Sequence, residues 1–112
     1  MSAAFKVIVI DPIKREVRAE RLMDGLKPLY ATMKTDMVQV VYPDAIGGET
    51  LWIDEEGKQK PNHHFELRTW EGDILAGVCV ISGDEADTAW SPEEIAEFVT
   101  WRPDLDGEQL LV

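Results

Sequence analysis

The sequence has little cysteine and no long apolar run. Its one cysteine, Cys79, excludes an internal disulfide, and the apolar residues around it predict a core position rather than a reactive thiol. No apolar run approaches the roughly 20 residues of a membrane span. The N-terminus also lacks the charged and apolar pattern of a secretory leader. We therefore expect a cytoplasmic protein that does not bind membranes.

Motifs for catalysis and cofactor binding are also missing. The sequence contains no Walker loop, dinucleotide fingerprint, nucleophile elbow or zinc-ligand spacing. Gly47-Gly48 lacks the helix and lysine that a phosphate-binding loop needs after its glycines. We predict no catalytic residue, no metal ligand and no cofactor.

Basic residues are scarce, and the acidic excess is uneven. The chain carries 11 Lys and Arg against 22 Asp and Glu, a net charge of −11. Residues 83–112 hold nine acidic residues and only Arg102, which gives −8, whereas residues 1–82 hold 13 acidic and 10 basic residues, which gives −3. Such a surface repels nucleic acids and attracts basic partners. The ordinary alternative is that the acidic residues serve only to keep the protein soluble.

The order of patterned segments predicts one small α+β domain over residues 1–112. Short β-branched or alternating runs predict strands. They lie at residues 5–10, 16–22, 37–42, 50–53 and 74–81, with 65–70 as either strand or helix. Asp24 is the predicted cap of a first helix. This order favours a mixed or mainly antiparallel sheet of about 4–6 strands with two helices packed on one face.

A second helix is predicted from Ser91, because Ser91-Pro-Glu-Glu94 matches a capping box with a proline start. Apolar residues at helical spacing continue to Trp101, and Pro103 ends the helix. The tail after it either docks as an edge strand or stays mobile. We therefore divide the domain into a sheet-rich region, 5–83, and an acidic C-terminal helix and tail, 84–112.

The adjacent histidines His63 and His64 are candidates for metal binding together with the acidic turn 54–57. Neighbouring residues on an extended segment point to opposite faces, so this pair chelates one ion poorly. The interpretation we prefer is two exposed loop histidines and a solvated Asp54-Glu-Glu-Gly57 turn. A small metal-dependent hydrolase using Asp54, Glu55, Glu56 and one histidine is the minor alternative.

Tryptophan and acidic residues together suggest a protein-binding surface in the C-terminal third. Trp90 lies among acidic residues, and aromatic residues framed by charge are common interface anchors. Its alternative role is a hydrophobic staple beside the helix cap. The predicted partner-binding residues are Asp84, Glu85, Asp87, Trp90, Glu93, Glu94, Glu97, Asp104 and Asp106.

Several short motifs follow one another along the chain: Ile46-Gly-Gly48, Asp54-Glu-Glu-Gly57, Pro61-Asn62 and the strand from Ile74 to Gly83. Their order resembles a family of small proteins of unknown function encoded mainly by bacteriophages, plasmids and their hosts. The resemblance covers residues 5–83 and implies a mobile-element setting. It implies no activity and no site residue.

These observations together predict a non-enzymatic, acidic interaction protein of a phage or plasmid. It would bind a basic surface of a host protein, with a nucleic-acid-binding protein as one candidate, and would not bind nucleic acid itself. In its sharpest form it is a DNA mimic that inhibits a host defence protein. The main alternative is a homodimer or larger homo-oligomer that pairs along the alternating segment 16–22.

Overall fold

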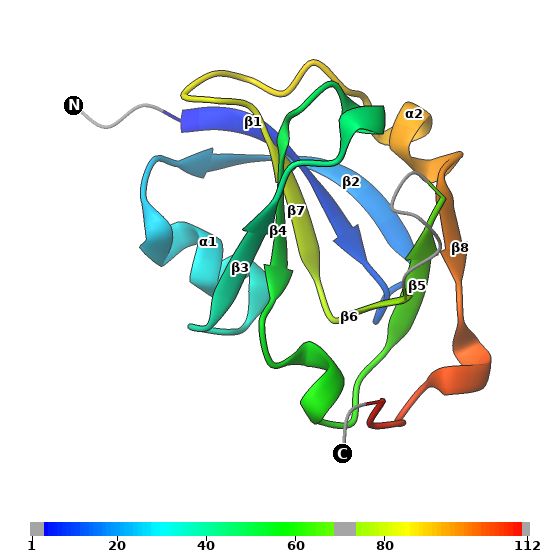
Figure 1. Cartoon of the computed structure of the whole chain (residues 1–112). Coiled ribbons are helices and arrows are strands. Elements are labelled where there is room, and N and C mark those ends of the chain that lie inside the picture. The colour runs from blue at the N-terminus through cyan, green and yellow to red at the C-terminus, as the bar shows by residue number, and fades with distance from the viewer. Residues whose placement is uncertain (1–3, 69–73, 111–112) are drawn as a thin grey trace.

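The computed structural model describes residues 4–68 and 74–110 (Figure 1). Its helices are α1 (Leu26–Met33) and α2 (Pro92–Ala96), and three short 3-10 turns are η1 (Asp44–Ile46), η2 (Gly57–Gln59) and η3 (Pro103–Leu105). The strands are β1 (Ala4–Asp11), β2 (Glu16–Met23), β3 (Val38–Val41), β4 (Thr50–Asp54), β5 (His64–Leu67), β6 (Ile74–Ala76), β7 (Cys79–Ser82) and β8 (Val99–Trp101).

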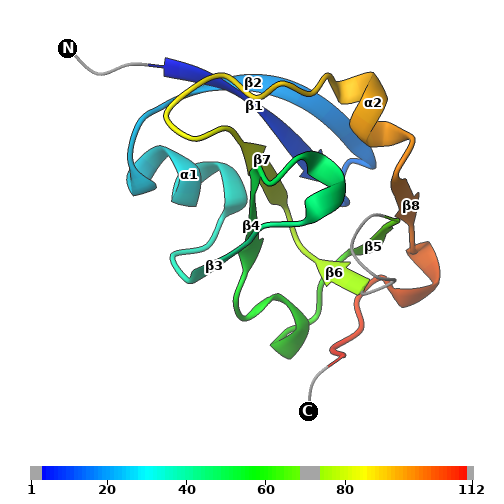
Figure 2. The same cartoon turned by 45° about the horizontal axis from the view of Figure 1, so that its top comes forward.

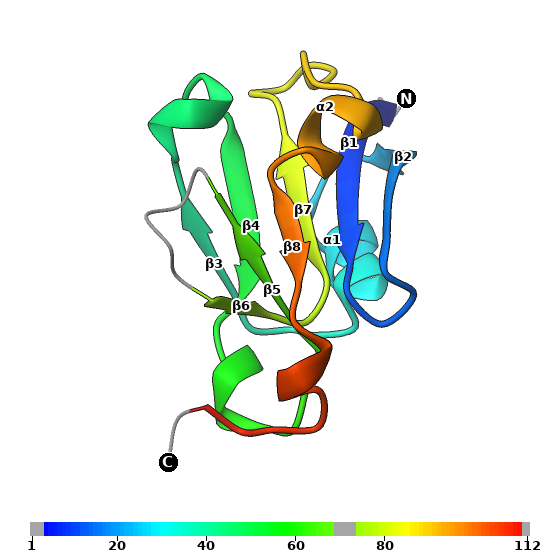
Figure 3. The ribbon, with the colours of Figure 1, turned by 90° about the vertical axis from the view of Figure 1, so that its right-hand side faces the viewer.

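Two antiparallel sheets form the body of the protein. The larger has the order β2-β1-β7-β4-β3 and the smaller the order β6-β5-β8. The β1–β2 hairpin is the longest pairing, running from Ala4 opposite Met23 to Asp11 opposite Glu16. The smaller sheet lies across one face of the larger (Figure 3). Helix α1 packs on the opposite face of β1 and β7, so both faces of these two strands bury side chains, which explains why the strands read as nearly continuous apolar runs.

Alternation along β1 divides the core into two clusters. Ile8 and Ile10 point to the cluster between the two sheets, and Val7 and Val9 point to the cluster beneath α1. The predicted α+β class, with antiparallel strands and two helices, is confirmed. The two helices do not share one face, however, because α1 contributes Leu29 to one cluster and α2 contributes Ile95 to the other. Figures 1 and 2 show α1 and α2 at opposite sides of the molecule.

The prediction of one continuous strand over 74–81 is wrong. Gly77 adopts a φ of 81°, a left-handed conformation that breaks the extended chain between β6 and β7. β6 then pairs with β5 in the smaller sheet, while β7 pairs with β1 and β4 in the larger. The apolar run thus passes from one sheet to the other at its glycine.

The second helix is shorter than predicted. The capping box is confirmed, because Ser91 accepts a hydrogen bond from the Glu94 amide and Glu94 from the Ser91 amide. The helix ends at Ala96, however, and residues 99–101 form β8, in which Trp101 lies opposite Phe65 of β5. Pairing with β5 satisfies the backbone of residues 99–101 and packs Val99 and Trp101 on the core.

Three other details differ from or complete the sequence interpretation. The cap of α1 is Gly25, without a side-chain hydrogen bond, rather than Asp24. Residues 64–67 are a strand, and Trp70 lies outside the described residues. The described part of the tail docks without forming a strand: the amide of Leu110 donates a 2.9 Å hydrogen bond to the Lys58 carbonyl.

Among the described residues, no helix has the length and apolar content to cross a bilayer.

Candidate functional site

Helix α1 covers only part of its face of the larger sheet. Its eight residues span about 12 Å, whereas five paired strands extend over about 19 Å. The uncovered part of the sheet forms a pocket of about 360 Å³. We call it the α1 pocket. Its lining residues are Phe5, Val7, Leu22, Met23, Asp24, Gly25, Leu29, Val40, Tyr42, Thr50, Trp52, Val80, Ser82, Gly83, Asp84, Glu85 and Ala86.

The floor of the α1 pocket is apolar, and the indole nitrogen in it has a hydrogen-bond partner within the protein. Val7 and Val80 of the central strands are buried, and Trp52 of β4 packs beside them. The indole nitrogen of Trp52 donates a 2.8 Å hydrogen bond to Ser82 Oγ on β7. The polar atom of Trp52 therefore has its partner within the protein, and the floor favours an apolar group of a ligand.

The rim of the α1 pocket is acidic. Asp24 follows β2, and Asp84 and Glu85 belong to the loop after β7. All three are exposed, and among the described residues that line the pocket there is no Lys, Arg or His. Carboxylates that converge on an opening without an opposing base create a negative potential, which attracts cationic groups.

The backbone of β1 and the side chain of Glu49 hold the loop that carries the rim acids. The Lys6 amide donates to Asp87 Oδ1 at 2.8 Å, and the Thr88 amide donates to the Lys6 carbonyl at 2.9 Å. The Glu49 carboxylate accepts hydrogen bonds from the Thr88 hydroxyl and the Ala89 amide. Residues 84–86 thus lie between the end of β7 at Ser82 and a segment that is held by β1 and Glu49, so Asp84 and Glu85 have a defined place at the rim.

Large apolar side chains remain exposed at the mouth of the pocket. Met23, Val40 and Tyr42 line it and are 46%, 36% and 62% exposed. Sequence reasoning missed this site because the alternation in β3 and β4 assigns residues to faces but does not show which face α1 leaves uncovered. Exposed apolar residues beside a pocket are typical of a binding surface.

The nine predicted partner-binding residues do not form one surface. Asp84 and Glu85 lie at the α1 pocket, and Glu93 and Glu97 are exposed on or next to α2. Residues 104–106 belong to or follow η3, at the opposite end of the molecule from residues 84–87 (Figure 1). The fold brings only Asp84 and Glu85 of this set to a pocket.

Four of the predicted acidic residues bind groups of the protein itself. Asp87 accepts from the Lys6 amide and lies 3.7 Å from Arg21, and Glu94 completes the capping box. Asp104 is held by two hydrogen bonds from Arg102, which lower its pKa. Asp106 lies 3.6 Å from Arg15. These contacts neutralise part of the acidity that the sequence displays.

Trp90 has internal partners as well. Its indole nitrogen donates a 3.0 Å hydrogen bond to the Ile46 carbonyl, and its ring meets Phe98 edge-on with centroids 6.0 Å apart. The residue is partly buried against the cluster between the sheets. Trp90 therefore joins η1 to the segment that follows α2.

The fold does not bring the histidine pair and the acidic turn together as a metal site. Asp54 ends β4, where its carboxylate binds Lys60 at 2.9 Å and the Glu56 amide at 3.0 Å. His64 lies in β5 of the other sheet. Across residues 4–68 and 74–110, no group of three or more His, Cys, Asp or Glu side chains is arranged to hold a metal ion.

The prediction of an exposed loop position is wrong for His64. It is the first residue of β5 and is 1% exposed, and neither ring nitrogen has a hydrogen-bond partner among the described residues. Burial lowers its pKa, against the opposing influence of the Leu105 backbone and the Asp106 carboxylate. His64 is buried because the C-terminal segment packs over the end of β5, a long-range contact that local sequence does not reveal.

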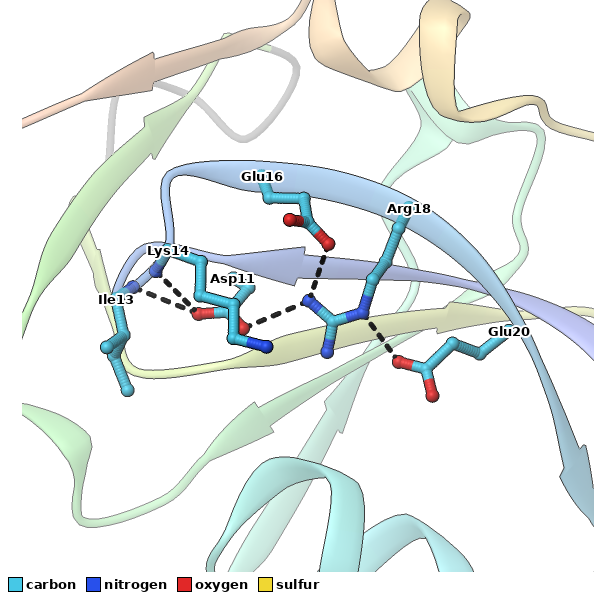
Figure 4. A network of polar contacts seen from close by, with 6 residues as sticks. All are labelled: Asp11, Ile13, Lys14, Glu16, Arg18 and Glu20. Carbon is cyan, nitrogen blue, oxygen red and sulfur yellow. Dashed lines mark hydrogen bonds and ion pairs between the residues drawn. The ribbon is translucent and has the colours of Figure 1, made fainter.

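A second polar cluster lies on the β1–β2 hairpin and has a structural role. Figure 4 shows the Arg18 guanidinium between the carboxylates of Asp11, Glu16 and Glu20, at 3.0, 3.3 and 2.8 Å. Asp11 also accepts hydrogen bonds from the amides of the turn. Every charged group of this cluster faces an opposite charge, so the cluster closes the hairpin.

Cys79 is fully buried, and burial raises the pKa of its thiol. The predicted role as a small core residue is confirmed.

Comparison with known proteins identifies the family. Residues 5–101 match the model of a domain of unknown function, DUF3846, and the chain belongs to this family. The predicted membership of a family of unknown function is thereby confirmed. No curated protein and no solved structure matches the chain.

Proposed function

We propose that this protein is a non-enzymatic binding module that holds a basic segment of another protein at the α1 pocket. An apolar side chain of the partner occupies the floor, and a cationic side chain lies at the rim formed by Asp24, Asp84 and Glu85. The observation that supports this most is the pairing of an apolar floor with three carboxylates and no basic residue in the lining.

The chemistry of the pocket favours binding over catalysis. No histidine or cysteine lines it, and the one hydroxyl with a defined partner, on Ser82, accepts a hydrogen bond from Trp52 rather than facing a base. Nucleophilic or acid-base catalysis requires a nucleophile and a base within hydrogen-bond reach of each other. The rim carboxylates are exposed and serve here as an electrostatic surface.

In this proposal the protein is encoded by a phage or plasmid and acts in the host cytoplasm. Its partner is a host protein with a basic surface, of which nucleic-acid-binding proteins are the prime candidates. Asp84, Glu85, Glu93 and Glu97 support the DNA-mimic form of the proposal. None of them has an ion pair with a described residue, and the segments that carry them follow one another along the top edge in Figure 1.

Two short labelled peptides test the proposal by fluorescence anisotropy. In one, arginines flank a phenylalanine, and in the other glutamates replace the arginines. We expect the arginine peptide to bind, more weakly as salt rises, and the glutamate peptide not to bind. If the two peptides bind equally, or if neither binds at low salt, the proposal is wrong.

A matched pair of variants localises the interaction. Asp24→Asn/Asp84→Asn/Glu85→Gln removes the rim charges, and Glu55→Gln/Glu56→Gln/Glu108→Gln removes the same charge from exposed positions outside the pocket. We expect the first variant to bind the arginine peptide about tenfold more weakly, since exposed charge pairs contribute about 0.5 kcal/mol each. The second should bind within about twofold of the wild type. Equal weakening by both would assign binding to the general acidity of the protein.

Competition tests the DNA-mimic form separately. A basic partner captured at low salt should be displaced by duplex DNA if both occupy one surface. A captured partner that DNA does not displace would contradict mimicry while leaving the binding module in place.

A further inference from the structure

The two edges of the larger sheet differ sharply in charge. β2, at one edge, carries Glu16, Arg18, Glu20 and Arg21, and its charges form ion pairs. β3, at the other edge, has the sequence Val-Gln-Val-Val and no charge. Proteins protect edge strands with charges, prolines or bulges against pairing with other chains. β2 carries such charges, whereas β3 carries none and is limited only by its length of four residues.

The backbone of β3 also presents hydrogen-bonding groups to the outside. The Glu55 amide donates a 2.8 Å hydrogen bond to the Met37 carbonyl, so this carbonyl is directed toward β4, whereas the Met37 amide donates to the Thr35 hydroxyl. Backbone groups alternate in direction along a strand, so Gln39 and Val41 also face β4 and Val38 and Val40 face outward. Within the described parts of the chain, the outward groups of Val38 and Val40 have no backbone partner.

This free edge adjoins the acidic pocket. Val40 and Tyr42 line the α1 pocket from the side of β3. A strand added to β3 would place every second side chain on the same face as Val40. Those side chains would lie beside Val40 and Tyr42, on the face of the sheet that carries the α1 pocket.

We infer that the basic segment binds in an extended conformation, as a sixth strand of the larger sheet along β3. This inference rests on the function proposed above and adds the binding mode and the conformation of the ligand. Main-chain hydrogen bonds to Val38 and Val40 supply affinity, and alternate side chains in the α1 pocket supply specificity. A second copy of this chain fits the edge less well, because its net charge of −11 would bring another acidic rim against the first.

A proline substitution distinguishes the contribution of backbone pairing at the β3 edge from that of side-chain contacts in the pocket. Val40→Pro removes one outward N–H without removing a hydrogen bond to β4, and edge strands tolerate proline there. Val40→Thr keeps the amide and changes the side chain alone. Gln39→Pro removes an inward N–H and should destabilise the protein, which verifies the orientation of β3.

The probe is a short fluorescein-labelled peptide in which arginine and valine take turns at every second position, with serine between them, so that both kinds of side chain lie on one face of the strand. A second peptide is N-methylated at alternate amides. We expect Val40→Pro to weaken binding about tenfold and to weaken it more than Val40→Thr, which measures the share of the side chain alone, with N-methylation of the peptide as damaging as the proline. The thermal midpoints of Val40→Pro and the wild type should agree within a few degrees.

The outcomes distinguish this inference from the function on which it rests. If the peptide binds and responds to the rim variant but not to Val40→Pro or N-methylation, strand addition is wrong and the basic-segment function stands. If the peptide does not bind the wild type, both fail. If light scattering shows a dimer that Val40→Pro converts to a monomer, the edge belongs to a second copy and the inference is overturned.

Discussion

The Nη1 atom of Arg18 on β2 lies 3.0 Å from Oδ2 of Asp11 at the end of β1, and it bridges the two strands of the hairpin. The Asp11 side chain is 8% exposed, so this carboxylate is largely withdrawn from water. Burial by itself would raise the pKa of Asp11, but the Arg18 contact and the turn amides outweigh burial and lower it. The strength of the contact that closes the hairpin therefore depends on pH.

Replacing Asp11 should destabilise the protein and alter its acid unfolding. Because the folded pKa lies below the unfolded one, the contribution of Asp11 is present above the unfolded value and is lost as pH falls through the folded value. We expect Asp11→Ala to lower the free energy of unfolding by about 2 kcal/mol at neutral pH, the range of hydrogen bonds to charged groups. Urea unfolding at neutral pH and at about pH 3 measures this, and the loss should shrink at the lower pH. A pH-independent loss would contradict the role of the Asp11 charge.

His64 should make the protein less stable in mildly acidic solution. Its folded pKa lies below that of the unfolded chain, about 6.5, because the ring is buried. Its neutral form stabilises the fold fully above that value, and this contribution is lost as pH falls toward the folded pKa. Thermal unfolding at about pH 7.5 and about pH 5.5 should show the loss.

Matched histidine variants assign this pH effect. His64→Leu fills the buried site without a titratable group and should reduce the pH dependence, whereas the neighbouring His63→Gln should retain it. Because the His64 nitrogens lack hydrogen-bond partners among the described residues, His64→Leu should be at least as stable as the wild type at neutral pH. An unchanged pH dependence in His64→Leu would show that another group is responsible.

Gly77→Ala should be more damaging than Gly48→Ala. Both glycines have positive φ, 81° and 76°, so both substitutions strain the backbone by about 1 kcal/mol. A Cβ at Gly77 would also lie 3.2 Å from the Asn62 side-chain nitrogen, whereas the space around Gly48 is open. We expect about 1 kcal/mol of further loss at Gly77, measured by urea unfolding. Equal effects would mean that Asn62 moves aside without cost.

Gly83→Ala should displace the acidic rim of the α1 pocket. A Cβ at this position would lie 2.7 Å from the Ala86 carbonyl oxygen and 2.9 Å from the Asp87 carbonyl oxygen, so the loop must shift. Asp84 and Glu85 move with it, and we expect binding of the arginine peptide to weaken severalfold. Amide chemical shifts should change most over residues 83–88. Unchanged binding with a shifted loop would show that the two carboxylates do not act at the pocket.

The sequence by itself determined the elements whose causes are local. Phe5–Ile10 and Glu16–Leu22 form the predicted hairpin strands because β-branched residues and alternation specify them within a few residues. The Ser91 capping box forms because its two hydrogen bonds join residues three apart. The acidic balance and the single core cysteine likewise needed no tertiary contact to be recognised.

Only the tertiary structure decided which apolar segments change sheet, which acids remain open and where a pocket forms. β8 replaces the end of a helix because β5 offers it a partner more than thirty residues back in the chain. His64 is buried by a tail that begins some forty residues later. Asp87 is held by the amide of Lys6, which lies 81 residues earlier in the chain. The α1 pocket exists because a short helix leaves part of a five-stranded face uncovered, and the relative size of two packed elements is not encoded in either one alone.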